Sequence, residues 1–91
     1  HQIKHLGQRI ELGDIEAAAN GVAGVEQTCC LYDDKRKRIV LYYTGGIDRK
    51  ELKAQLRPLL PPYMVPNNTR QLTAMPLTKN GKIDRTALNR A

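Results

Sequence analysis

The chain has 91 residues, of which 41% are apolar and 26% are charged, and its formal net charge is +6. A chain of this length buries roughly 60–65% of the surface that its unfolded form exposes, so it can form one modest core but not a deep substrate cavity. No apolar run is long enough to cross a bilayer, and no segment resembles a signal peptide. We therefore expect a soluble, cytoplasmic domain with no membrane partner.

The basic charge is densest in the run Lys35-Arg36-Lys37-Arg38, directly after Asp33-Asp34. Such a run can contact phosphates without sequence specificity, so a non-catalytic basic module that binds an acidic partner, either a carrier protein or nucleic acid, is the alternative to a catalytic function. The run also has the composition of an exposed hairpin turn. The four tyrosines do not form the spaced stacking platform of single-strand binders, which argues against nucleic acid.

Cys29 and Cys30 are adjacent, and the chain has no other cysteine. Neighbouring side chains on a strand point to opposite faces, so a disulfide between them is not expected. His1 and His5 could share one side of a strand, but two histidines do not make a structural metal site. The sequence therefore predicts two reduced, structural cysteines and no metal site.

Residues 1–12 contain two short extended runs that flank Gly7, which predicts a β-hairpin with this glycine between its strands. Gly13-Asp14 then opens a helix. Asp14 and Glu16 fall in its first turn, where the helix dipole favours negative charge. An apolar stripe at helical spacing predicts the buried face of this helix: Ile15, Ala18, Ala19 and Val22.

Strand signals follow at residues 25–32 and 38–44, and the charged turn between them predicts an antiparallel pair. Asp48 is predicted to cap a second helix, with Glu51 at the capping-box position three residues later. Pro61-Pro62 ends that helix. Four leucines are predicted to form its inward stripe: Leu52, Leu56, Leu59 and Leu60.

A short strand over residues 69–74, a polar loop over 75–84 and a last helical turn over 85–90 complete the predicted order. Together the elements predict an α+β fold. It has an N-terminal β-hairpin, then a small three-stranded sheet with two helices packed on it, and a C-terminal lysine loop.

Three segments contain specific combinations of residues that the formation of the predicted elements does not require: residues 3–16, 60–66 and 76–85. None of them contains a nucleophile–base pair, a glycine-rich phosphate loop or clustered carboxylates. What remains is Lys82 on a glycine-containing loop, a cation suited to meeting an anion.

At these segments the chain resembles the C-terminal subdomain of the adenylate-forming, or AMP-binding, enzymes. This family includes non-ribosomal peptide synthetase adenylation domains, acyl-CoA synthetases and luciferases. The forms Arg-Ile-Glu-Leu-Gly-Asp-Ile-Glu (9–16), Leu-Pro-x-Tyr-Met-x-Pro (60–66) and Asn-Gly-Lys-x-Asp-Arg (80–85) are most similar to the amino-acid-activating branch. The matches stand in order and span nearly the whole chain.

The resemblance implies a ligase reaction in two steps. A carboxylic or amino acid reacts with ATP and Mg²⁺ to give an acyl-adenylate and pyrophosphate, and the phosphopantetheine thiol of a carrier protein, or CoA, then takes the acyl group. In the family, the C-terminal subdomain rotates between the steps and presents one face for each. The N-terminal AMP-binding subdomain holds ATP and Mg²⁺ and selects the acid, so the resemblance implies it as the main partner.

By position, the resemblance implies that Lys82 reaches the acid carboxylate and the nucleotide during adenylation. It also implies that Asn80 and Gly81 shape the turn and that Asp84 and Arg85 anchor its exit. Without the other two segments, Lys82 would read as one of fifteen basic residues on a solvated loop.

The predicted hairpin carries the residues that the resemblance assigns to the second step. Gly7 matches a glycine beside the pantetheine channel. Lys4 matches a lysine that faces the adenylate, and Arg9 matches an arginine near the nucleotide or the thiol cofactor. The alternatives are a plain turn glycine and two exposed hairpin cations. Residues 60–66 are expected to be structural.

The resemblance assigns residues 1–91 to one lid subdomain, with the hairpin at 1–12, the α+β core at 13–74 and the catalytic-lysine loop and tail at 75–91. It places the family hinge just before His1 and the N-terminal subdomain outside the chain, so we expect the isolated chain to be inactive. Three parents stay open: a peptide-synthetase module, a D-alanine–carrier ligase and a free-standing acyl ligase.

Overall fold

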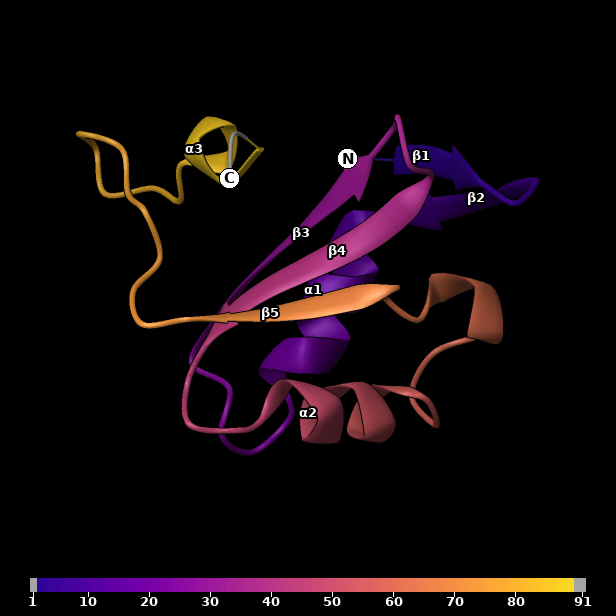
Figure 1. Cartoon of the computed structure of the whole chain (residues 1–91), viewed down its shortest axis with the longest axis horizontal. Coiled ribbons are helices and arrows are strands. Elements are labelled where there is room, and N and C mark those ends of the chain that lie inside the picture. Colours follow the sequence, from indigo (N-terminus) through magenta and orange to yellow (C-terminus); the bar gives the residue numbers. More distant parts are fainter. Residues whose placement is uncertain (1, 90–91) are drawn as a thin grey trace.

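The computed structural model describes residues 2–89. His1, Arg90 and Ala91 lie outside the described residues, and so do the expected end of the last helical turn and one half of the His1–His5 pair. The elements run in this order (Figure 1): β1 (Gln2–His5), β2 (Gln8–Glu11), α1 (Leu12–Asn20), β3 (Gln27–Asp33), β4 (Arg38–Thr44), α2 (Arg49–Leu56), the short 3₁₀ helix η1 (Pro62–Met64), β5 (Asn68–Leu72) and α3 (Arg85–Asn89).

The three-stranded sheet has the order β3-β4-β5, and β1 and β2 form a separate antiparallel hairpin. β3 and β4 are antiparallel, as the sequence predicts, with Cys30 opposite Leu41. β5 pairs in parallel with β4, which the crossover through α2 makes possible. The α+β fold class is therefore confirmed.

Both faces of the sheet are covered. α1 and α2 pack on one face, where the larger core contains Ile15, Cys30, Leu41 and Leu52, all fully buried. Full burial of one such aliphatic side chain contributes roughly 1.5–3 kcal/mol. On the other face, a smaller cluster joins β3 and β4 to the C-terminal segment through Cys29, Tyr42, Met75 and Leu88.

α2 begins as predicted, because the side chain of Asp48 accepts a hydrogen bond of 2.9 Å from the amide of Lys50. Its end differs from the prediction, since the helix stops at Leu56. Leu59 then falls outside the helical stripe and is 57% exposed, so its predicted place in the core was wrong. Leu60 is half-buried against the larger core.

α1 begins at Leu12, one to two residues before the predicted start. Asp14 lies in its first turn as expected. Glu16 does not act as a second dipole partner there. Its carboxylate points toward β3 and accepts a hydrogen bond of 2.7 Å from the amide of Cys30.

The segment before β3 touches the turn after β4 at two glycines. Gly45 has φ of 127°, and a Cβ atom on it would lie 2.0 Å from the carbonyl oxygen of Gly24. The amide of Ile47 in turn donates to that same Gly24 carbonyl at 3.3 Å. This contact fixes the start of the α2 crossover against the rest of the core.

Within residues 2–89, no helix has the length and apolar character that a membrane crossing needs.

Candidate functional site

The lysine loop, residues 75–84, is a small self-bonded hairpin. Leu77 and Ile83 form an isolated antiparallel bridge. The amide of Thr78 donates to the carbonyl of Lys82 at 2.7 Å, and the amide of Gly81 donates to the carbonyl of Thr78 at 3.0 Å. Gly81 has φ of 81°, a left-handed conformation that glycine adopts without strain. The loop therefore has a defined turn, with Lys82 on its returning arm.

The base of the lysine loop is closed by Asp84. Its amide donates to the carbonyl of Pro76 at 2.8 Å, which joins the two arms. Its side chain accepts from the amide of Ala87 at 3.1 Å, so it also starts α3 in the manner of a helix cap. Met75 and Leu88 on either side are buried in the smaller cluster. These contacts fix both ends of the loop to the sheet.

Arg85, the first residue of α3, contacts a residue that is 69 positions away in the sequence. Its Nη2 lies 3.2 Å from Oε2 of Glu16, and the two side chains are 35% and 19% exposed. Its Nη1 donates to Sγ of Cys29 at 3.2 Å and to the carbonyl of Cys30 at 3.4 Å. The exit of the lysine loop is thus bonded to both α1 and β3.

The side chains at the turn of the lysine loop face solvent. Lys79, Asn80 and Lys82 are all exposed. The ion pairs found among residues 2–89 join Arg36 to Asp33 and Arg85 to Glu16, so Lys82 takes part in neither. An exposed ammonium on a firmly based loop can be presented to an anion held by another domain.

The N-terminal hairpin presents Lys4 and Arg9 together. They are direct partners in the β1–β2 ladder, so both side chains lie on the same side, and both are exposed. The neighbouring pair, Ile3 and Ile10, faces the other way, and Ile10 is buried in the larger core. The cations of the hairpin therefore lie on its outer side.

Leu6 and Gly7 form the tip of the hairpin, and both have positive φ, 53° and 77°. This is the pattern of a type I′ turn, in which glycine and asparagine are preferred. A Cβ atom on Gly7 would meet nothing within 4 Å, so no neighbouring atom of the domain demands a glycine there. Leu6 is 77% exposed.

His5 anchors the hairpin to the sheet. It is buried, its Nδ1 lies 3.1 Å from the hydroxyl of Tyr32, and the two rings meet edge to face. The sequence did not predict this contact, because it joins residues 27 positions apart. It orients β1 and β2 relative to β3.

The lysine loop and the N-terminal hairpin lie at different ends of the molecule. In Figure 1 the loop is the orange-yellow segment between β5 and α3, on the far left, and β1 and β2 are on the right. The longest dimension of the molecule is 36 Å. The predicted site residues therefore form two separate groups, Lys82 with its loop and Gly7 with Lys4 and Arg9, and the fold does not bring them together.

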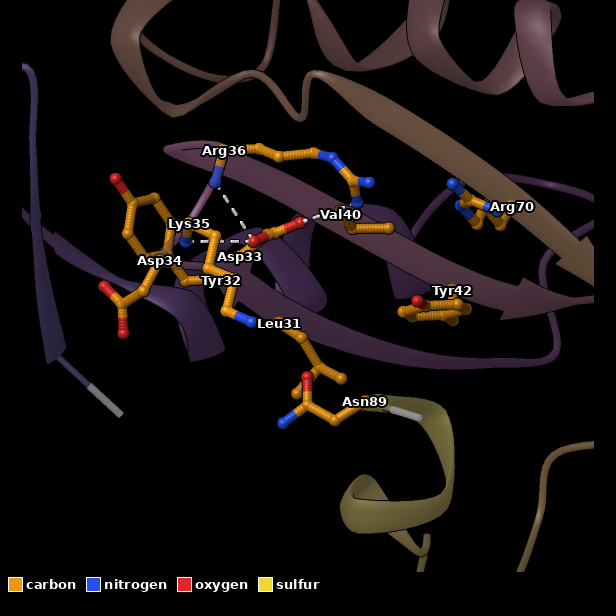
Figure 2. Close-up of a pocket in the computed structure, with 10 residues that line it drawn as sticks. All are labelled: Leu31, Tyr32, Asp33, Asp34, Lys35, Arg36, Val40, Tyr42, Arg70 and Asn89. Atoms are coloured by element: carbon orange, nitrogen blue, oxygen red, sulfur yellow. Dashed lines mark hydrogen bonds and ion pairs between the residues drawn. The ribbon is translucent and has the colours of Figure 1, made fainter. Parts of the chain in front are cut away.

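A depression of about 570 Å³ lies between the β3–β4 turn and α3 (Figure 2). Leu31, Val40 and Tyr42 form part of its wall, and Arg36 at the turn pairs with Asp33 at 3.4 Å. It contains none of the predicted site residues.

The basic run Lys35-Arg36-Lys37-Arg38 is on an exposed turn, as the sequence predicted. The ion pair between Arg36 and Asp33 partly offsets the charge of this run.

The two cysteines are free and buried. Burial raises the pKa of the Cys29 thiol, although Arg85 acts in the opposite direction. Burial and the nearby Glu16 carboxylate raise the pKa of Cys30 still further. Because the thiolate is the reactive form, these groups are suited to packing rather than to nucleophilic chemistry.

Residues 14–82 match the family model of the AMP-binding enzyme C-terminal domain. The chain belongs to this family. Tyrocidine synthase 2 of Brevibacillus parabrevis is 45% identical to this C-terminal domain over 92 residues, and the dimodular nonribosomal peptide synthase of Bacillus subtilis is 40% identical over 93 residues. These matches cover 96% and 97% of the chain but only 3% and 4% of the relatives.

Solved structures agree with this assignment. The domain superposes on Klebsiella oxytoca NpsA in complex with 3-hydroxyanthranilyl-AMSN with a TM-score of 0.89, 29% identity, and coverage of 99% of this chain and 19% of that one. MatB of Rhodopseudomonas palustris shares the fold alone, with a TM-score of 0.87 at 14% identity over 98% of this chain and 19% of that chain. The AMP-binding C-terminal domain is thus a small part of each of these proteins.

Proposed function

We propose that this domain is the mobile lid of an ATP-dependent acid–thiol ligase of the adenylate-forming class. In this proposal Lys82 serves the formation of the acyl-adenylate, most simply an aminoacyl-adenylate. After rotation of the domain, the hairpin around Gly7 serves thioester formation on a phosphopantetheine thiol. Support comes from the family membership, from the peptide synthetases among its relatives, and from the position of the two groups at different ends of the fold.

The observation that carries the proposal is the form of the lysine loop. Lys82 is exposed, while the loop beneath it is held by the bonds from Thr78 and Asp84. Negative charge shifts to the bridging oxygen as pyrophosphate leaves, and a preplaced ammonium in a closed site stabilises that charge. Loss of one such donor typically costs about 3–4 kcal/mol, or roughly a hundred- to thousandfold in rate.

The second step would use the outer side of the hairpin. Gly7 leaves open space at the tip, because no atom of the domain lies within 4 Å of where its Cβ would be. A thin pantetheine chain could pass there. Lys4 and Arg9 present an ammonium and a guanidinium group on the side that an adenylate or a cofactor phosphate could approach.

In this proposal, ATP and Mg²⁺ are bound mainly by the N-terminal subdomain. Residues 2–89 bring together no group of three carboxylate, imidazole or thiol side chains that could hold a metal ion. In this proposal the domain contributes cations, Lys82 for the first step and Lys4 and Arg9 for the second. The proposed partners are the N-terminal subdomain, the carrier protein or CoA, and a small carboxylic or amino acid.

The experiment is Lys82→Ala in the full-length enzyme, followed by ATP–pyrophosphate exchange. The exchange rate should fall roughly a hundred- to thousandfold. Lys79→Ala is the matched control, because Lys79 is an exposed lysine on the same loop. An equal fall in both variants would favour a diffuse basic surface over a single catalytic lysine.

A further inference from the structure

Glu16 occupies the centre of a charged junction between three elements. A single oxygen, Oε2, accepts from the amide of Cys30 on β3 at 2.7 Å and from Nη2 of Arg85 on α3 at 3.2 Å. Glu16 itself belongs to α1. Both hydrogen bonds are charge-assisted at the carboxylate, a class that is stronger than neutral hydrogen bonds.

The guanidinium of Arg85 contacts three residues. Besides Glu16 it contacts Sγ of Cys29 at 3.2 Å and the carbonyl of Cys30 at 3.4 Å. Only 19% of the Glu16 side chain and 35% of the Arg85 side chain are exposed. Partial burial reduces the screening that makes surface ion pairs weak, so this pair can hold a geometry that an exposed pair would not.

Arg85, which contributes its guanidinium to this junction, lies three residues after Lys82 in the sequence. Between them, Ile83 packs on the smaller cluster and Asp84 closes the base of the loop. The loop's other tethers to the outer sheet face are the apolar contacts of Met75 and Leu88 and one long hydrogen bond of 3.5 Å, which the hydroxyl of Tyr42 donates to the carbonyl of Leu88. Apolar contacts have little directional preference. The Arg85 contacts have fixed directions and tie the loop to α1, on the opposite face of the sheet.

We infer that Glu16 is a positioning residue for adenylate formation, which acts through Arg85 to fix the direction in which the lysine loop presents Lys82. This inference rests on the proposed function of Lys82. The N-terminal hairpin has its own anchors, Ile10 in the larger core and His5 against Tyr32. Loosening the junction therefore affects the first half-reaction and spares the second.

The test is Glu16→Gln in the full-length enzyme, with both half-reactions measured. The rate constant of ATP–pyrophosphate exchange should fall by up to about a hundredfold, the scale that a misplacement of 1 Å can produce. The KM for ATP and thioester formation from preformed acyl-adenylate should stay close to those of the unaltered enzyme. Asp14→Asn is the matched control, because Asp14 is an exposed acid on the same helix, and both rates should stay unchanged.

A double variant separates positioning from simple destabilisation. If Glu16 acts through Lys82, then Glu16→Gln should cause no further loss of exchange in the Lys82→Ala background, because residues that act as a unit are not additive. Additive losses, or an equal fall in both half-reactions, would overturn the inference. So would unchanged exchange in Glu16→Gln while Lys82→Ala is inactive. If Lys82→Ala itself retained full exchange, the proposed function would fail instead.

A second variant covers the case in which Glu16→Gln does not fold, since the amide of Cys30 would lose a charged acceptor. Arg85→Lys keeps the positive charge and the Cys30–Glu16 hydrogen bond but removes the planar group that contacts several partners at once. Exchange should fall in this variant, and amide hydrogen exchange should speed up at Lys82 and Asp84. Unchanged rates for exchange and for these amides would contradict the inference.

Discussion

Thr78 and Lys82 are bonded to each other across the turn of the lysine loop. The amide of Thr78 donates to the carbonyl of Lys82 at 2.7 Å, and the amide of Lys82 lies 3.3 Å from the hydroxyl oxygen of Thr78. These bonds use the backbone of Lys82 and leave its side chain exposed. The loop thus holds the position of the residue while its ammonium stays available to a second domain.

Gly81→Ala tests whether the shape of that turn matters. No atom lies within 4 Å of the new methyl group, but alanine is strained at φ of 81° by about 1–2 kcal/mol. Relaxation of this strain should displace Lys82 and slow ATP–pyrophosphate exchange in the full-length enzyme. Gly46→Ala, an exposed glycine with equally open surroundings, serves as the control. Equal exchange rates in the two variants would contradict this dependence.

Gly45→Ala should be the most damaging glycine substitution in the core. The left-handed φ of 127° costs about 1–3 kcal/mol in alanine. The overlap with the Gly24 carbonyl, only 2.0 Å away, adds about 1–3 kcal/mol or more. The midpoint of urea unfolding should therefore fall strongly relative to Gly46→Ala. A midpoint within error of that control would show that the contact is not required.

Leu6→Asn should stabilise the domain. Leucine at φ of 53° is strained by about 1–2 kcal/mol, and asparagine is preferred at this place in a type I′ turn. A gain of about 1 kcal/mol raises the melting temperature by roughly 4–8 °C in a domain of this size. Leu59→Asn is the control, because Leu59 is also exposed but has no left-handed strain to relieve. An equal rise in both variants would point to the general effect of replacing an exposed leucine as the cause.

Thiol labelling tests the assignment of Cys29 and Cys30 as structural. Burial and the raised pKa of both thiols keep them protonated at pH 8, where an ordinary cysteine is partly ionised. A thiol reagent should therefore label the folded chain far more slowly than the chain in urea. Labelling should accelerate with pH only above the usual cysteine range. Rapid labelling of the folded chain at pH 8 would be incompatible with this assignment.

Local signals in the sequence predicted much of the fold. Asp48, with Glu51 three residues later, indicated the start of α2, and the charged turn between two strand signals indicated the β3–β4 pair. The exposed position of Leu59 could not be predicted in this way, because the helix ends one turn earlier than the leucine spacing implies. The parallel pairing of β5 with β4 depends on the crossover path, which periodicity does not encode.

For the candidate site, too, local sequence signals identified some residues and missed others. Lys82, Gly7, Lys4 and Arg9 were identified by motif, and their functional roles stay predictions. Glu16 was taken for a helix-dipole partner, because its true contact, Arg85, is 69 residues away in the sequence. Glu16 and Arg85 carry opposite charges and lie in residues 3–16 and 76–85, two of the three segments that the sequence analysis singled out. This is the one sequence signal that could have pointed to the pair.

The most direct test of the proposed division of labour follows both half-reactions of the full-length enzyme in single turnovers, comparing Lys82→Ala with Gly7→Trp. Lys82→Ala should slow the appearance of acyl-adenylate roughly a hundred- to thousandfold while sparing the transfer of preformed adenylate to the thiol. Gly7→Trp should leave adenylate formation nearly intact and block the transfer. If each variant instead slowed both half-reactions equally, the division of labour between the two ends of the domain would be contradicted.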